Sequence, residues 1–136
     1  MASSKEPGNN FVIVRTLSPR EVVELLLREF PAMQDVICPD EFCFEEPTRS
    51  YDCFAAEVIR RKHDQQFMTS VAQFSNVAAK GRDYLLRTAL ETSLLEGIAA
   101  DEEVARKLAG MLGETALKLL QDIERKVYGR NRPGNG

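Results

Sequence analysis

Apolar side chains recur at helical spacing over most of the chain, and this spacing constrains the fold more than any other feature. After Ser50 they follow positions i, i+3, i+4, i+7 and i+8, which places them on one face of a helix. These residues are Tyr51, Phe54, Ala55, Val58 and Ile59. A second apolar stripe runs from Phe67 to Ala78. The polar stretch 60–66 between the two stripes predicts two antiparallel helices instead of one long helix.

Capping residues mark where further helices begin. Ser18 and Glu21 fit a capping box around Pro19, and Pro31 is expected to end that first helix. Later helices are preceded by an acidic cap and followed by a glycine. The caps are Asp64, Asp83 and Asp101, and the glycines are Gly81, Gly97, Gly110 and Gly129.

This punctuation predicts an all-α fold of about six helices. They are expected to form stacked helical hairpins, as in HEAT repeats, or an irregular helical bundle. The hairpins would span residues 50–80 and 83–128. The apolar run 11–14 and the alternating segment 41–45 are candidates for a small two-stranded element near the N-terminus.

Length and composition bound the domain organisation. At 136 residues and 15.3 kDa, the chain is expected to form a single helical domain over residues 11–129. Residues 1–10 and 130–136 are rich in Gly, Asn, Pro and charge, and are expected to be disordered tails. No signal-peptide pattern and no bilayer-length apolar run occurs, so a cytoplasmic location is expected.

Three cysteines and the single histidine are the main candidates for chemistry. Cys38, Cys43, Cys53 and His63 could supply four metal ligands, but no CxxC or HxxxH pair brings two ligands close together. Phosphate-binding glycine loops, GxGxxG and HExxH are also missing from the sequence. Packing thiols are the favoured interpretation, with no catalytic residue, metal or cofactor predicted. The alternative is a small thiol- or metal-dependent enzyme or sensor that uses these four residues.

The net charge of −3 hides a strong segregation along the chain. Residues 31–57, here called the acidic segment, carry seven acidic residues against Arg49 alone, a local charge of −6. Its aromatic residues are natural interface anchors, and its acids would steer a basic protein partner toward them. The predicted partner-binding residues are Asp40, Glu41, Phe42, Phe44, Glu45, Glu46 and Tyr51. Neither nucleic acid nor membrane is expected as a partner, and the oligomeric state stays open. The charge blocks could also neutralise one another across packed helices.

The stretch from Val71 to Glu114 resembles a widespread family of small uncharacterised bacterial helical proteins. The likeness lies in a helix ending in Leu95-Glu96, an acidic turn, and the step Leu112-Gly113. In size and charge the chain is also similar to immunity proteins, the small acidic antidotes to secreted bacterial toxins. Neither resemblance implies catalytic residues. Together with the acidic segment they favour a protein-protein interaction module, with an immunity-type antidote as one form of it.

Overall fold

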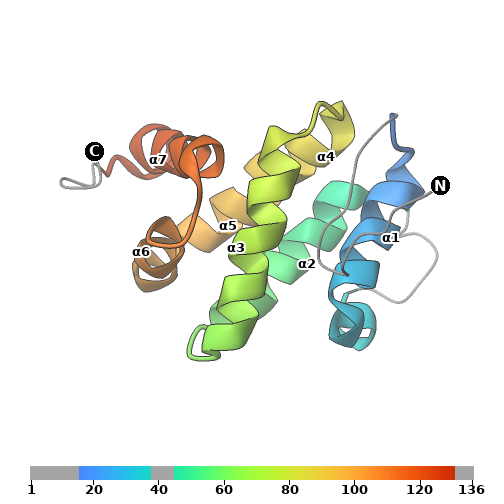
Figure 1. Cartoon of the computed structure of the whole chain (residues 1–136), viewed down its shortest axis with the longest axis horizontal. Helices are drawn as coiled ribbons and strands as arrows, with labels where there is room; N and C mark the ends of the chain where they lie inside the picture. The colour runs from blue at the N-terminus through green and yellow to red at the C-terminus, as the bar shows by residue number, and fades with distance from the viewer. Residues whose placement is uncertain (1–15, 38–44, 131–136) are drawn as a thin grey trace.

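The computed structural model describes residues 16–37 and 45–130, and every regular element within these ranges is helical (Figure 1). In chain order they are α1 (Pro19–Glu29), the 3-10 helix η1 (Pro31–Asp35), α2 (Pro47–Arg60), α3 (Gln65–Lys80), α4 (Tyr84–Thr88), the π-helix η3 (Ala89–Leu95), α5 (Glu96–Ala99), α6 (Glu102–Ala109) and α7 (Glu114–Tyr128). The predicted all-α bundle is confirmed. Residues 11–14 and all of the segment 41–45 except Glu45 lie outside the described ranges, and HEAT-like stacking stays a prediction.

The predicted helix starts are confirmed by their hydrogen bonds. The Ser18 hydroxyl accepts from the Glu21 backbone N–H at 3.2 Å, and the Glu21 carboxylate accepts from the Ser18 N–H at 2.9 Å. Asp64 caps α3 and Asp101 caps α6 in the same way, because each side chain accepts a hydrogen bond from the backbone N–H three residues later. Asp83 caps α4 at 2.9 Å and also accepts from the Leu17 N–H at 2.5 Å, which ties the start of the bundle to its middle.

One continuous helix covers residues 84–99, because α4, η3 and α5 follow one another with helical dihedral angles at both junctions. Gly97 was expected to end this helix, and that prediction was wrong. The residue lies inside α5, where a β-carbon on it would stand 2.8 Å from the Cβ of Ala55 on α2. Gly97 therefore serves close packing between two helices, not termination.

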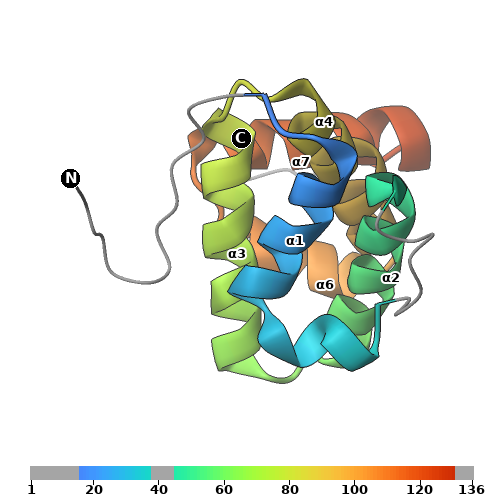
Figure 2. The same cartoon turned by 90° about the vertical axis from the view of Figure 1, so that its right-hand side faces the viewer.

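The helices surround one apolar core. In Figure 1, α3 crosses the middle of the molecule, with α1 toward one end and α6 and α7 toward the other. Figure 2 shows α1 lying between α3 and α2 in the view along the long axis. Eight large apolar residues from α1, α2, α3, η3 and α7 are buried in one cluster, and Ile123 packs against its edge. The eight are Val22, Leu26, Phe54, Val58, Phe74, Leu90, Leu94 and Leu120.

Aromatic rings hold α1, α2 and α3 together at the centre of the bundle. The ring of Phe30 lies 4.8 Å from that of Phe54 and 5.6 Å from that of Phe74, measured between centroids. Phe67 meets Phe30 edge to face at 5.8 Å. Such tilted and edge-on pairs add to the apolar burial of the rings. No helix in the described part of the chain is both long and apolar enough to cross a bilayer.

Candidate functional site

The acidic segment begins in η1 and ends in α2. Four of its predicted partner-binding residues lie outside the described ranges, namely Asp40, Glu41, Phe42 and Phe44. Glu45 is exposed just before α2, and Glu46 is half-buried at the N-cap of that helix. The Glu46 carboxylate pairs with Arg49 at 3.6 Å, a surface contact that contributes little to stability.

The prediction that Tyr51 belongs to the docking surface is wrong. Its side chain is fully buried, and its hydroxyl donates a hydrogen bond to the Val22 carbonyl at 3.0 Å. Burial, with the Asp83 carboxylate as a second cause, raises the pKa of Tyr51 well above its ordinary value. The helical spacing that put Tyr51 on the apolar face of α2 outweighs its aromatic character as an interface residue. Tyr51 therefore joins α2 to α1 inside the bundle.

Of the three remaining described acids of the segment, one is buried and two are exposed. Glu57 is buried, and its carboxylate accepts from Arg60 Nε at 3.0 Å and from Arg61 Nε at 2.5 Å. These two hydrogen bonds lower the pKa of Glu57. Asp35 and Asp52 are exposed, and like Glu45 they form no ion pair within residues 16–37 and 45–130. Among the described acids of the segment, the exposed carboxylates without an ion pair are therefore those of Asp35, Glu45 and Asp52.

The predicted thiol and histidine site is only partly described. Cys38 and Cys43 lie outside the described ranges. Cys53 packs against the core in the middle of α2, and His63 is exposed in the turn that follows this helix. The seven steps along α2 from Cys53 to Arg60 alone rise about 10 Å along the helix axis, which keeps Cys53 and His63 apart. Among the described residues no three His, Cys, Asp or Glu side chains gather as a metal site requires. A site built on Cys38 and Cys43 stays a prediction, and native mass spectrometry with and without a chelator tests it.

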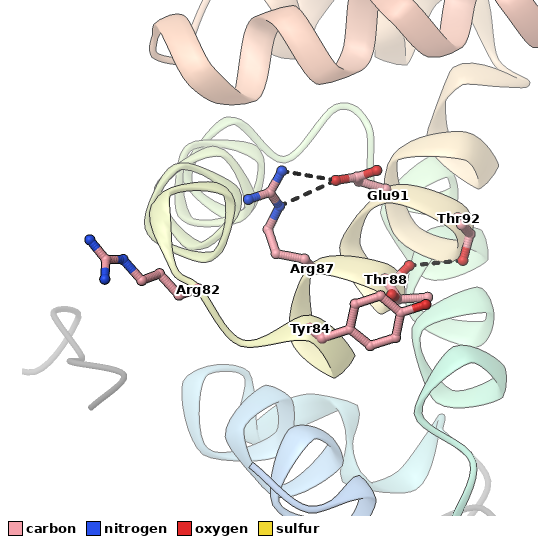
Figure 3. Close-up of a pocket in the computed structure, with 6 residues that line it drawn as sticks. All are labelled: Arg82, Tyr84, Arg87, Thr88, Glu91 and Thr92. Carbon is pink, nitrogen blue, oxygen red and sulfur yellow. Dashed lines mark hydrogen bonds and ion pairs between the residues drawn. The ribbon is translucent and has the colours of Figure 1, made fainter. Parts of the chain in front are cut away.

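A surface pocket of about 450 Å³ opens beside the helix 84–99 (Figure 3). Six residues line it, and it is called here the Tyr84 pocket: Arg82, Tyr84, Arg87, Thr88, Glu91 and Thr92. Arg82 comes from the loop after α3, the next three residues from α4, and the last two from the π-helix η3. Tyr84 is 77% exposed, more than any other large hydrophobic residue in the described part of the chain.

Most polar groups of the Tyr84 pocket are held by internal bonds. Arg87 pairs with Glu91 through Nε at 3.2 Å and through its terminal nitrogen at 3.1 Å. The Thr92 hydroxyl donates to the Thr88 carbonyl at 2.8 Å. Arg82 is different, because its exposed guanidinium extends from the rim and meets no partner among the described residues (Figure 3). The pocket therefore has an exposed aromatic ring, and at its rim a cation that meets no partner in the described part of the chain.

The sequence contains two signals of this pocket, although none of its six residues was a predicted site residue. One is a local excess of basic residues, because Arg82 and Arg87 belong to residues 58–88, which carry a local charge of +4. Tyr84 lies two positions before Leu86 and so falls off the apolar face that begins there. An aromatic residue at a polar position next to a helix cap is the pattern that could have found the site.

No protein-family model, no curated protein and no solved structure matches this chain.

Proposed function

We propose that this chain is a cytoplasmic protein-protein interaction module that binds a basic partner through the acidic segment. An immunity-type antidote, which covers and blocks a basic toxin, is the form of this function that fits its size and charge. The observation that carries the proposal is the set of exposed carboxylates of Asp35, Glu45 and Asp52, which no cation of the described ranges neutralises. Asp35 and Glu45 bracket residues 38–44 in the chain, which add Asp40 and Glu41.

Uncompensated surface charge of one sign is suited to attracting a partner of the other sign. It accelerates the encounter more than it strengthens the final complex. Binding energy would come from apolar anchors, and the sequence supplies Phe42 and Phe44 between the acids. Tyr51 has a supporting part in this proposal, because its bond to Val22 fixes the helix on which the segment ends.

Local neutralisation accounts for only part of the acidic charge. Glu57 is satisfied by Arg60 and Arg61, and Glu46 by Arg49. If the segment served only the fold, its other described acids would be expected to meet cations in the same way. Asp35, Glu45 and Asp52 do not, which favours an external partner over internal pairing.

Affinity capture with two matched triple variants tests the proposal. The test variant is Asp35→Asn, Glu45→Gln and Asp52→Asn, and the control variant is Glu24→Gln, Glu102→Gln and Glu114→Gln. Both remove three exposed carboxylates, but the control changes α1, α6 and α7 instead of the acidic segment.

Lysate of the source cells is passed over each immobilised protein, and the bound proteins are quantified by mass spectrometry. We expect a basic protein to be retained by the natural chain and by the control variant, and lost from the test variant. Equal retention by all three would contradict the proposal. Thermal melts of the three proteins confirm that they are folded.

A further inference from the structure

We infer that the Tyr84 pocket is a second docking site, and that it binds a segment of a partner protein in which a carboxylate lies next to an apolar side chain. The pocket shares no residue with the acidic segment, so this inference stands independently of the function proposed above. Three features of the pocket carry it: the exposed ring, the free cation and the π-helical wall.

The Tyr84 ring is exposed although its neighbours in the chain are buried. Asp83 before it and Leu86 after it are both almost inaccessible to solvent, yet the ring itself is 77% exposed. Tyrosine combines a large apolar face with a hydroxyl that tolerates water, which makes it frequent at the energetic centres of protein interfaces. Thr88 and Thr92 line the same pocket and give the partner's apolar side chain further surface beside the ring.

The charge of this surface selects an acidic partner. Arg87 and Glu91 neutralise each other, so the pocket's free charge is that of Arg82. Lys80 ends α3 two residues earlier and is also exposed without an ion pair among the described residues. A carboxylate fits the planar donors of arginine in a two-pronged geometry.

The backbone supports a binding role as well. Glu91 and Thr92 belong to η3, in which seven residues adopt the rare π-helical pattern inside a longer α-helix. Short π-helical segments inside α-helices are frequently found at functional sites. Here the π segment meets solvent on the side that carries the pocket, while Leu90, Leu94 and Leu95 fill the core on the other side.

Selection from a phage-displayed library of random peptides against the full-length chain tests the inference. We expect enriched peptides to carry Asp or Glu adjacent to Phe, Tyr, Leu or Ile. Their affinity should fall roughly tenfold or more for Tyr84→Ser and for Arg82→Gln, since each removes one of the two recognition elements. The matched controls are Val127→Ser and Arg106→Gln, which remove an exposed apolar residue and an exposed arginine from α7 and α6.

Several outcomes would overturn the inference. One is the enrichment of basic peptides, or of acidic peptides whose binding is insensitive to Arg82→Gln and Tyr84→Ser. Self-association that depends on Tyr84, detected by light scattering, would assign the pocket to a second copy of the chain. Saturation of the same residues by inorganic phosphate alone, followed by NMR, would reduce it to an anion site. Loss of a captured partner in the acidic-segment variant leaves this result unchanged, so the two proposals fail separately.

Discussion

Ala55 on α2 occupies the space that a side chain on Gly97 would need. The Cβ of Ala55 lies 2.8 Å from the position of a β-carbon built on Gly97, closer than non-bonded carbons approach. Both contacting positions lie on regular helices, so relief of this contact requires a movement of one helix against the other. This contact sets how closely α2 packs against the helix 84–99.

Gly97→Ala is therefore expected to destabilise the fold, although alanine is the better helix former. The gain in helix propensity is about 1 kcal/mol, whereas overpacking costs about 1–3 kcal/mol. Urea unfolding should show a net loss for Gly97→Ala that is reduced when Ala55→Gly is added, so the two substitutions are coupled. Gly110→Ala is the matched control, because its β-carbon would meet nothing closer than 3.6 Å. Equal effects of the two alanine substitutions would contradict this account.

The second prediction concerns the aromatic centre of the core. Phe54 is completely buried and Phe74 nearly so, and each contacts the ring of Phe30. Replacing either with alanine leaves a large cavity and should lower the free energy of unfolding by roughly 3–5 kcal/mol. Tyr84→Ala removes a ring of similar size from the surface and should change it by less than about 0.5 kcal/mol. A loss under about 1 kcal/mol at both phenylalanines would show that the helix faces are misassigned.

The third prediction is a pH dependence that originates at Glu57. Hydrogen bonds from Arg60 and Arg61 lower its pKa in the folded state below the ordinary value of 4.5. A lowered carboxyl pKa stabilises the fold above that ordinary value, and the stabilisation disappears as the pH falls through the folded pKa. Glu57→Gln should therefore cost stability near neutral pH and make the loss between pH 5 and pH 3 less steep.

Glu29 provides a control of opposite sign for the pH experiment. Burial raises the pKa of this carboxyl, with Arg28 opposing the rise. Its contribution therefore grows as the pH falls, and Glu29→Gln should not make the acid loss less steep. Denaturant midpoints measured from pH 7 to pH 3 compare the two variants, and identical curves would refute the assignment to Glu57.

The fourth prediction concerns Arg130 and the C-terminal cap of α7. Gly129 adopts a left-handed conformation with φ of 64°, which returns the Arg130 N–H to the Glu124 carbonyl at 2.8 Å. The Arg130 side chain then pairs with the buried Glu124 carboxylate at 3.2 Å and donates to the Ala99 carbonyl. Arg130→Gln should lower the free energy of unfolding by about 1–3 kcal/mol, because a buried carboxylate loses its cation.

The neighbouring surface pair gives the comparison for Arg130. Arg125 and Asp122 lie 2.7 Å apart on the same helix, with the Arg125 side chain exposed and that of Asp122 half-buried. Arg125→Gln should cost no more than about 0.5 kcal/mol, since exposed pairs contribute little. Thermal melts of the two variants compare their losses of stability. A larger loss for Arg125→Gln than for Arg130→Gln would contradict the stabilising role given to Arg130.

The sequence predicted most of the helix starts and the core, because both depend on local chemistry. The capping box at Ser18 and the caps at Asp64, Asp83 and Asp101 need only a side chain within reach of the next turn. The apolar spacing predicts one helix face for Phe54 and Val58, and both are buried in the core. Both signals depend on residues that lie within a few positions of one another in the sequence.

The features that the sequence did not reveal depend on residues far apart in the chain. The prediction that Gly97 ends a helix is wrong, because the contact of Gly97 with Ala55 on another helix cannot be seen in the sequence. The start of α2 at Pro47, before the apolar period resumes at Ser50, was missed although proline favours the first turn. The π-helical segment and the Tyr84 pocket beside it also depend on the packing of several elements, which the sequence does not show.

The fifth prediction concerns the acidic segment as a steering surface. Replacing Asp40, Glu41, Glu45 and Glu46 with Asn or Gln keeps their size and removes their charge. We expect the unfolding free energy to change by less than about 1 kcal/mol, as is usual for surface substitutions. The association rate with the captured basic partner should fall, because long-range attraction acts chiefly on the encounter.

The most direct test measures that association rate at low and at high salt for the natural chain, the quadruple variant, and the control variant of Glu24, Glu102 and Glu114. Steering predicts that added salt slows the natural chain and the control, and that the quadruple variant is slow at low salt and responds little to added salt. Equal association rates for all three proteins, unchanged by salt, would contradict the proposed function.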